Sequence, residues 1–448
     1  MARLFGTDGI RGEAGMFPLD ASTVFTIGAS LASRMRGRLG RDVRFVTGRD
    51  TRESGEWIER QLIGGAVSGG AECTSAGVIT TPGVAFITRA FEFDLGIVIS
   101  ASHNPFYDNG IKAFLPSGKK IEEELEMEVE ADIASNANAA AEDPEFSVDD
   151  EHTAEYRRAY LEHLTRATTE FRLDGYRLVV DCANGAASDL APDLFRSLGA
   201  DVIAINCRPD GRNINENCGS LHLEHLQKQV VDVQADLGVA FDGDADRSLF
   251  VDEKGMIVDG DAVLWILGKR MHDGGELKSG KVIATVMSNI GLEIALSSRG
   301  IQLVRTPVGD KYVLDELLRS GAEIGGEQSG HIIFPNDSLV GDGMMTALRL
   351  LEAAGTSDSS LSELSVGFRR YPQVLVNVRV AEKRPFDEVD AIRKASADAE
   401  NLLSGSGRLL LRYSGTENLA RVMIEGRDQH EIEALANSLA ETIRVELG

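Results

Sequence analysis

Short apolar runs that end abruptly in polar residues recur along the chain. The clearest is Leu95–Ile99, an uncharged and β-branched run that predicts a strand buried on both faces. A polar loop follows as far as Pro105, and the residue before a proline is pushed out of helical geometry. Ser102 is therefore expected on a constrained loop at the carboxyl end of a buried strand, where ligands bind in open α/β sheets. Its hydroxyl could act as a nucleophile or carry a phosphoryl group; the alternative is a turn whose Ser and Asn side chains cap backbone groups.

A pattern of strand, helix, strand, helix and strand occurs three times. The first strands of the three units begin at 43, 177 and 281, and the third strands end in the polar loops 100–104, 241–247 and 326–331. This alternation predicts mostly parallel sheets with crossover helices. Three similar units would each deliver one polar loop from the equivalent strand end. Three independent α/β units with ordinary turns are the alternative.

The last part of the chain has a different pattern. After Gly367, strands at 374–380, 408–412 and 420–424 alternate with helices at 385–403 and 430–447, which predicts a smaller α+β domain. Residues 131–151 are rich in Ala, Asn, Asp and Glu, as expected for a solvated linker. We therefore expect three similar α/β domains at 1–152, 153–254 and 255–368 and a C-terminal α+β domain at 369–448.

Composition excludes several classes of function. A chain of 448 residues with 43% apolar residues can bury several cores. Its formal charge of −25 argues against nucleic acid and anionic membranes as partners, although a phosphorylated substrate needs only a local basic pocket. The four cysteines have no metal-binding spacing, the N-terminal residues lack the core of a signal peptide, and no apolar run could span a membrane. A cytoplasmic protein is expected.

The second polar loop places Asp242, Asp244 and Asp246 at alternate positions beside a glycine. Three carboxylates this close cannot all stay ionised without a cation, and oxygen ligands favour Mg²⁺ over zinc. A calcium loop of the EF-hand type is excluded, because its sixth position would be Arg247 where that loop needs glycine. An acidic turn on the surface is the remaining alternative.

Three further segments carry groups suited to a sugar phosphate. Glu327 and Ser329, followed by His331, offer hydrogen-bonding groups for vicinal hydroxyls. The last domain has a loop with the composition of a phosphate cradle, formed by Arg412, Ser414, Gly415, Thr416 and Arg421. Near the N-terminus, Arg11 lies among three glycines and could bind a phosphate. Ordinary capped turns are the alternative at each place.

These segments together indicate phosphoryl transfer. A phosphoryl group on Ser102 would supply a further oxygen ligand to the cation. The metal would balance the charge of the transferring group, and nearby Lys and Arg side chains would stabilise the in-line transition state. Lys112, just after the serine loop, could be a base or such a charge stabiliser, or a solvated lysine.

With these loops assembled, the chain resembles the α-D-phosphohexomutase superfamily over essentially its whole length. The matching motifs are an active-serine loop at 101–105, a metal loop at 242–247, a sugar loop at 326–331 and a phosphate loop at 412–417. The resemblance implies four domains around a central cleft and a phosphoserine at Ser102. It also implies one Mg²⁺ per chain, held by Asp242, Asp244, Asp246 and the Ser102 phosphate.

The same resemblance assigns the other roles. Arg11, Lys112 and His103 would take part in catalysis, as acid, base or transition-state stabilisers. The substrate would be bound by the following residues: Arg247, Glu327, Ser329, His331, Arg412, Ser414, Gly415, Thr416 and Arg421.

The amino-sugar branch of the superfamily is the most similar one. This rests on the segments 5–12, 213–215, 218–220 and 308–313, and on His222 and Gln328. The implied reaction interconverts glucosamine 6-phosphate and glucosamine 1-phosphate through a bisphosphate. Glucose or mannose phosphates as substrates, a metal-dependent phosphatase and a non-catalytic sugar-phosphate sensor are the alternatives. The sequence leaves open whether the protein forms a homodimer.

Overall fold

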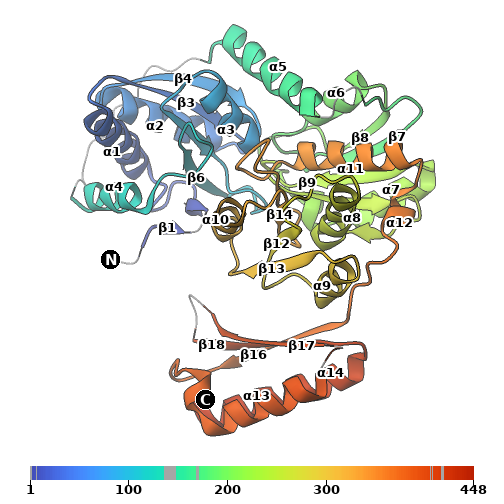
Figure 1. Cartoon of the computed structure of the whole chain (residues 1–448). Helices are drawn as coiled ribbons and strands as arrows, with labels where there is room; N and C mark the ends of the chain where they lie inside the picture. Colours follow the sequence, from blue (N-terminus) through green and yellow to red (C-terminus); the bar gives the residue numbers. More distant parts are fainter. Residues whose placement is uncertain are drawn as a thin grey trace.

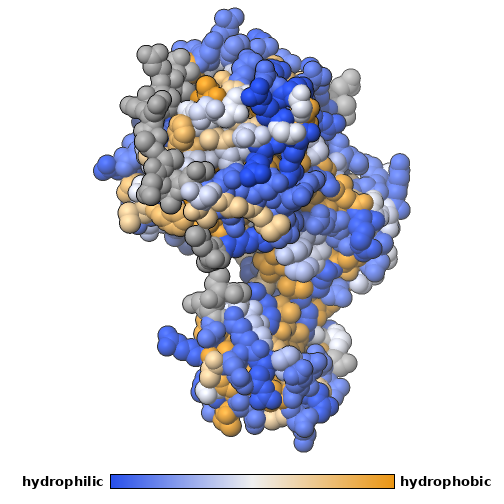
Figure 2. All heavy atoms as spheres, turned by 90° about the vertical axis from the view of Figure 1, so that its left-hand side faces the viewer, coloured by the Kyte–Doolittle hydropathy of each residue, from blue (hydrophilic) through white to orange (hydrophobic). Residues whose placement is uncertain are grey.

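Four sheets organise the part of the chain that the structure describes (Figure 1), and the second of them extends past the expected boundary at 254 as far as Val258. The computed structural model describes residues 3–6, 8–135, 148–167, 171–403, 405, 407–414 and 418–448. The first three sheets lie together in one body, and the last forms a separate lobe, which Figure 2 shows from another side. Among the described helices, none is both long and apolar enough to cross a lipid bilayer.

The first sheet has six strands in the order β1-β2-β6-β5-β3-β4. They are β1 (Phe5–Gly6), β2 (Gly9–Glu13), β3 (Val43–Arg49), β4 (Ala71–Val78), β5 (Leu95–Ile99) and β6 (Asp108–Phe114). The accompanying helices are α1 (Ala21–Leu39), α2 (Gly55–Ser68), α3 (Thr81–Ala90) and α4 (Glu123–Ser135). All five residues of β5 are buried, as its uncharged sequence predicts.

The second sheet has five strands in the order β11-β10-β9-β7-β8. They are β7 (Arg177–Asp181), β8 (Asp201–Ile205), β9 (Leu237–Phe241), β10 (Ser248–Asp252) and β11 (Ile257–Val258). The helices of this part are α5 (Asp150–Ala167), α6 (Leu190–Ser197), α7 (Glu224–Val233) and the 3₁₀ turn η1 (Gly219–Leu221).

The third sheet has four strands in the order β13-β12-β14-β15. They are β12 (Lys281–Thr285), β13 (Gln302–Thr306), β14 (Gly325–Gly326) and β15 (Ile332–Ile333). The helices of this part are α8 (Gly260–Asp273), α9 (Ile290–Ser297), α10 (Asp310–Ser320), α11 (Gly343–Ser357) and α12 (Leu361–Leu364).

The predicted threefold repeat is present in the strand order. The three units contain the parallel sets β4-β3-β5, β8-β7-β9 and β13-β12-β14, with the first strand of each unit in the middle. Antiparallel strands extend each sheet beyond the third strand, so the sheets are mixed but mostly parallel in their centres. Each third strand ends at the same edge as its parallel neighbours, which is the edge expected to bind ligands.

The last domain is the predicted α+β domain, and its sheet is antiparallel. Its strands β16 (Gln373–Arg379), β17 (Arg408–Tyr413) and β18 (Leu419–Glu425) pair in the order β16-β18-β17. Its helices are η2 (Phe386–Glu388), α13 (Asp390–Leu403) and α14 (Gln429–Leu447). Figure 1 shows α13 and α14 on the side of the sheet that faces away from the other domains.

Hydrophobic packing separates this lobe from the rest. One continuous core joins side chains of the first three sheets, such as Val98, Val180 and Val282. The last domain has a core of its own, in which Val422 of β18 packs with Ile443 of α14. A body held by its own core can move as a unit relative to its neighbours.

Two boundaries differ from those that the sequence predicts. The residues from Asp20 to Arg36 predict a helix that is stopped by Gly37. In the structure α1 continues through Gly37 to Leu39, because it is the next residue, Gly40, that adopts the left-handed conformation (φ 66°) that terminates helices. The predicted linker 131–151 begins inside α4, where Ile133 is buried, and ends inside α5. Its central residues, 136–147, lie outside the described part of the chain.

Candidate active site

Ser102 lies on a strained loop directly after β5. Its backbone has φ 54°, a left-handed conformation that is costly for a residue with a side chain and is concentrated at functional sites. The Ser102 N–H donates to Ser100 Oγ at 2.9 Å, and the Ser100 hydroxyl donates to Asp50 Oδ2 at 2.6 Å. Both serines are almost fully buried. The loop is therefore held in place by hydrogen bonds from within the first domain.

The side chains of Arg52 and Asn215 hold the same loop in place by hydrogen bonds to its backbone carbonyl oxygens. The buried Arg52 donates through Nη2 to the carbonyl oxygens of Ser102 and Asn104, both at 2.9 Å. Asn215, from the second domain, donates through Nδ2 to the same two oxygens at 2.9 and 3.0 Å. Sequence reasoning did not single out Arg52, and it assigned no role to Asn215, which lies in the segment 213–215 that supports the resemblance. A signal existed for Arg52, because it follows the end of β3, the strand end equivalent to those that carry the other polar loops.

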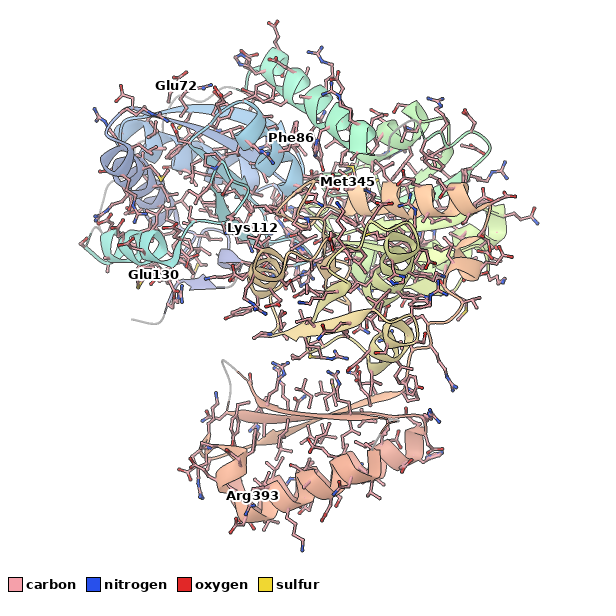
Figure 3. All side chains as sticks on the ribbon, in the orientation of Figure 1. Glu72, Phe86, Lys112, Glu130, Met345 and Arg393 are labelled. Atoms are coloured by element: carbon pink, nitrogen blue, oxygen red, sulfur yellow. The ribbon has the colours of Figure 1, made fainter. Side chains whose placement is uncertain are left out.

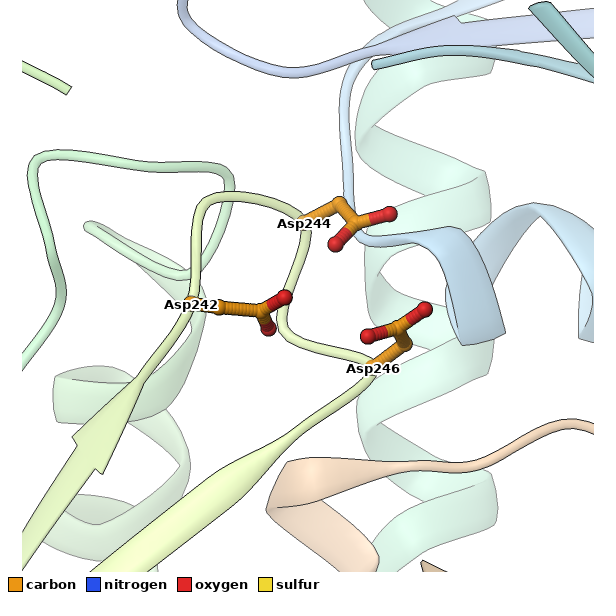
Figure 4. A group of neighbouring side chains, drawn as sticks. All are labelled: Asp242, Asp244 and Asp246. Atoms are coloured by element: carbon orange, nitrogen blue, oxygen red, sulfur yellow. The ribbon is translucent and has the colours of Figure 1, made fainter. Parts of the chain in front are cut away.

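The three aspartates converge beside Ser102. One oxygen from each of Asp242, Asp244 and Asp246 lies within 4.8 Å of the others, and Figure 4 shows the carboxylates around one point. Ser102 Oγ donates to Asp242 Oδ2 at 2.5 Å. Ala245, between two of the aspartates, has φ 56°, which bends the loop so that alternate side chains meet. The serine loop of the first domain and the aspartate loop of the second therefore meet at this point.

The aspartate cluster fits a cation. Oδ1 of Asp244 and Oδ1 of Asp246 are buried and have no hydrogen-bond partner among the described residues. Burial and the charges of Asp246 and Asp244 raise the pKa of Asp242 well above its usual value. A divalent metal among these oxygens would supply the missing partners and keep all three carboxylates ionised. The cluster can therefore hold a metal ion.

Lys112 on β6 reaches into this cluster. Its Nζ lies 2.9 Å from Asp244 Oδ2 and 3.4 Å from Asp246 Oδ2, and the side chain is almost fully buried. Burial alone would lower its pKa, but the carboxylates of Asp244 and Asp8 outweigh burial and hold that pKa well above the usual value. Figure 3 places Lys112 near the middle of the molecule, where the first domain meets the others. It is a fixed positive charge beside the serine and metal loops.

Asp8 lies in the segment 5–12 that supports the resemblance, but sequence reasoning assigned it no role; in the structure it connects several cations. It lies in the turn between β1 and β2. Its Oδ2 accepts from Arg11 at 2.5 Å and lies 2.9 Å from Lys112 Nζ, and its Oδ1 lies 2.6 Å from Lys120 Nζ. Burial would raise the pKa of Asp8, but Lys112 and Lys120 hold it well below the usual value. The ionised Asp8 therefore positions Arg11 and Lys112 relative to each other. The expected phosphate-binding Arg11 does lie at the site.

His103 lies beside the serine hydroxyl, and Arg247 lies beside His103. His103 Nδ1 is 3.3 Å from Ser102 Oγ and 3.4 Å from Arg247 Nη1. Burial, with the positive charges of Arg247 and Arg11, lowers the pKa of His103 to about 4, so the ring is neutral at pH 7. The Arg247 N–H donates to Asp242 Oδ1 at 3.1 Å. Both residues are brought to the site as expected.

The sugar loop between β14 and β15 closes one side of the site. Glu327 Oε1 accepts from the Gly309 N–H at 3.1 Å, and Ser329 Oγ donates to Glu327 Oε2 at 3.2 Å. His331 Nδ1 lies 3.7 Å from Asp246 Oδ1. A cleft of about 420 Å³ adjoins these groups, lined by residues that include Arg11, Asp246, Arg247, Glu327 and His331. The predicted sugar and metal loops therefore share one cleft.

The expected phosphate loop lies apart from this cleft. Arg412 and Arg421 face each other on the paired strands β17 and β18, and the Ser414 N–H donates to Leu419 O at 2.8 Å. Gly415 and Thr416 lie outside the described residues. Within the described chain, the lining of the cleft contains no residue of the last domain. The structure therefore brings three of the four expected loops together.

Polar contacts join the last domain to the third. Arg408 of β17 donates to the carbonyl oxygens of Val286 and Ser288 at 3.0 and 3.1 Å, and it also pairs with Glu425 of β18 at 2.8 Å. Glu425 in turn accepts from Asn289 Nδ2 at 3.1 Å. This junction lies next to the end of β12, which is the third domain's counterpart of β3.

Comparison with known proteins agrees with this architecture. Segments 2–140, 158–255 and 259–371 match the models described as phosphoglucomutase/phosphomannomutase alpha/beta/alpha domains I, II and III, and 375–442 matches the C-terminal domain of that family. The phosphoglucosamine mutase of Solibacter usitatus is 50% identical over 99% of both chains. The chain belongs to the phosphoglucosamine mutase family. The phosphoglucosamine mutase of Rhodococcus opacus is 47% identical, again over 99% of both chains.

Solved structures confirm the phosphohexomutase fold of this family member. A phosphoglucomutase/phosphomannomutase family protein from Burkholderia thailandensis superposes with a TM-score of 0.80 at 24% identity, covering 99% of this chain and 97% of the other. The N-acetylphosphoglucosamine mutase of Aspergillus fumigatus, solved in complex with GlcNAc-6P and magnesium, gives a TM-score of 0.67 at 20% identity over 99% and 95% of the two chains.

Proposed function

We propose that this protein interconverts glucosamine 6-phosphate and glucosamine 1-phosphate, with Ser102 as the phosphoryl carrier. The main support for this proposal is the hydrogen bond of 2.5 Å from Ser102 Oγ to Asp242 Oδ2. Asp242 belongs to a cluster of three aspartates in which two buried oxygens have no hydrogen-bond partner among the described residues. A phosphoryl group on this hydroxyl would lie at a cation site, which is what transfer of that group requires.

The chemistry consists of two transfers in opposite directions. Phosphorylated Ser102 gives its phosphoryl group to the free hydroxyl of the sugar phosphate: a new O–P bond forms as the bond to Ser102 Oγ breaks, and the proton of the sugar hydroxyl leaves to the site. The proton that the sugar hydroxyl loses in this transfer ends on Ser102 Oγ. The resulting bisphosphate turns over in the cleft. Its other phosphoryl group then returns to Ser102, whose hydroxyl proton passes to the sugar oxygen that loses the phosphoryl group, and this releases the isomeric product and restores the enzyme.

One Mg²⁺ per chain is the proposed cofactor, held by Asp242, Asp244, Asp246 and the phosphate on Ser102. When bound, it would neutralise negative charge on the transferring group. Support comes from the oxygen-only set of ligands and from the magnesium in the Aspergillus fumigatus structure.

The other expected site residues divide by the charge that they carry. Lys112 and Arg11 would stabilise the transition state; the raised pKa of Lys112 favours this role over that of a general base. The neutral His103 can exchange a hydrogen bond with the serine hydroxyl. Arg247, Glu327, Ser329 and His331 would bind the sugar phosphate in the cleft.

The last domain would bind the phosphate that is not being transferred. The phosphate-binding residues in this proposal are Arg412, Ser414, Gly415, Thr416 and Arg421. Because this domain has its own core, its rotation towards the cleft could admit and release the sugar.

The expected domain bounds at 152, 254 and 368 also remain a prediction, which the four matched segments support. A cytoplasmic location likewise remains a prediction.

A substitution of the carrier serine tests the proposal. Ser102→Ala should abolish turnover of glucosamine phosphates and retain their binding, because the sugar loop is untouched. Intact-mass measurement should find one added phosphoryl group on the wild-type protein and none on the variant. Full activity of Ser102→Ala would remove Ser102 from the mechanism. Turnover of glucose or mannose phosphates in preference to glucosamine phosphates would favour those substrates instead.

A further inference from the structure

Asp310, the first residue of α10, lies beside the sugar loop. The Gly309 N–H that precedes it donates to Glu327 Oε1 at 3.1 Å, which ties the start of α10 to that loop. Asp310 Oδ2 lies 4.0 Å from His331 Nε2, at the other end of the same loop. The Asp310 side chain is 21% exposed and lines the cleft together with Glu327 and His331.

Asp310 already accepts a primary ammonium group. Lys120 Nζ lies 2.6 Å from Asp310 Oδ2 and 2.6 Å from Asp8 Oδ1, and thus joins the third domain to the first. Figure 1 shows α10 beside the strands of the first sheet, where this bridge forms. The start of α10 therefore presents a carboxylate whose surroundings are suited to an alkylammonium ion.

The other carboxylates that line the cleft have different partners. Asp246 belongs to the aspartate cluster and pairs with Lys112. Asp8 is contacted by Arg11 and by two lysines. Glu327 is engaged by a backbone N–H and a serine hydroxyl, the kind of site that suits ring hydroxyls. Asp310 is paired with Lys120 and lies 4.0 Å from His331, and it belongs neither to the aspartate cluster nor to the pair formed by Asp8 and Arg11.

We propose that Asp310 is a specificity-determining residue that accepts the ammonium group of a 2-amino sugar phosphate. The inference rests on the proposed function and names the group that distinguishes an amino sugar from a hexose. If vicinal ring hydroxyls bind to Glu327, the substituent on the adjacent carbon faces the neighbouring start of α10. An ammonium ion there forms a charge-assisted hydrogen bond with Asp310, whereas a neutral hydroxyl forms a weaker hydrogen bond.

Binding of two ligands to the Mg²⁺-loaded full chain tests the proposal. Asp310→Asn should weaken the affinity for glucosamine 6-phosphate by about 10- to 100-fold. It should change the affinity for glucose 6-phosphate by no more than about threefold. Asp310→Glu, which keeps the charge, should retain part of the preference for the amino sugar. Asp315→Asn, an exposed position on the same helix, is the matched control and should alter neither affinity.

A second variant separates recognition from structural support. Lys120→Met removes the bridge but leaves Asp310 available, so the preference for the amino sugar should persist or increase. Equal weakening of both ligands by Asp310→Asn, loss of preference in Lys120→Met, or equal affinity of the wild type for both ligands would overturn the proposal. Turnover by the wild type is measured separately: its absence on glucosamine 6-phosphate would refute the proposed function, whatever the binding preference.

Discussion

Ser102 Oγ and Asp242 Oδ2 form a hydrogen bond of 2.5 Å across 140 positions of the chain. The two residues follow β5 and β9, which are the equivalent third strands of the first and second units. The repeated topology thus directs two similar strand ends towards each other. Because one loop brings a hydroxyl and the other a set of carboxylates, their meeting creates a site whose behaviour depends on charge.

Metal removal should abolish turnover and expose the repulsion among the aspartates. A chelator should lower turnover by about 10³-fold or more, and added Mg²⁺ should restore it, because a bound metal supplies several kcal/mol of charge stabilisation. Steady-state assays before and after dialysis measure this. Full activity in the presence of excess chelator would contradict a metal-dependent reaction.

Asp242→Asn should stabilise the metal-free protein while abolishing activity. The pKa of Asp242 is raised in the folded state, so its contribution to stability is greatest at low pH and falls as the pH rises through the folded pKa. Removing this carboxylate should therefore reduce the loss of stability between pH 5 and pH 7. Urea unfolding in the presence of chelator gives the free energy of unfolding of the wild type and the variant at the two pH values. If the difference between pH 5 and pH 7 is the same for both proteins, the prediction is contradicted.

Lys112→Met should lower both stability and turnover. It leaves the buried Asp244 without its ammonium partner, which should reduce the free energy of unfolding by about 3–5 kcal/mol. Loss of the fixed charge should reduce kcat by about 10²–10³-fold. Lys119→Met is the control, because Lys119 is exposed and should tolerate the change. Denaturant unfolding and kcat are measured for both; a Lys112→Met variant with normal kcat would remove the charge from the mechanism.

Gly243→Ala should separate the metal loop from the serine loop. A Cβ atom at this position would lie 2.5 Å from Ser102 O and 2.9 Å from Ile214 Cδ1, so the backbone must move. We expect a destabilisation of about 1–3 kcal/mol and a loss of about 100-fold in kcat. Gly37→Ala in α1 is the control: nothing lies within 4 Å of its Cβ, and it should gain about 0.5–1 kcal/mol. Normal kcat in Gly243→Ala would show that the two loops need not touch.

Asp342 should make stability depend on pH. Burial raises its pKa from 3.8 to about 6, while it caps α11 and accepts from Tyr160 Oη at 2.8 Å. The protonated Asp342 contributes about 3 kcal/mol to the free energy of unfolding. This contribution is fully present below the pKa that the carboxyl has in the unfolded chain, and it is lost as the pH rises through 6. Asp342→Asn should flatten that dependence, because Asn also caps helices but does not ionise. Asp358→Asn, exposed at the other end of α11, is the control; urea unfolding from pH 4 to pH 7 gives the slopes, and an unchanged slope for Asp342→Asn would contradict the assignment.

The local pattern of the sequence was sufficient for the elements and the chemical groups. The uncharged run 95–99 predicts β5, and its polar continuation identifies Ser102, because side-chain periodicity and backbone preference act over a few residues. The alternate placement of Asp242, Asp244 and Asp246 likewise predicts a cation cluster from adjacent positions. Repetition of the pattern also predicted three similar domains, whose strand orders agree.

Only the tertiary structure could assign the partners of these groups. Asp8 meets Lys112 and Lys120 across more than 100 positions, and Asn215 reaches the serine loop from another domain. Such contacts depend on how whole sheets pack, and no periodicity within a segment encodes them. The same applies to the pKa of Lys112, which is set by carboxylates distant in sequence, and to Asp310, whose position beside Glu327 comes from the packing of α10 against the sugar loop. The local sequence thus determines which chemical groups each loop presents, and the fold determines the charge state of those groups and the geometry of the site.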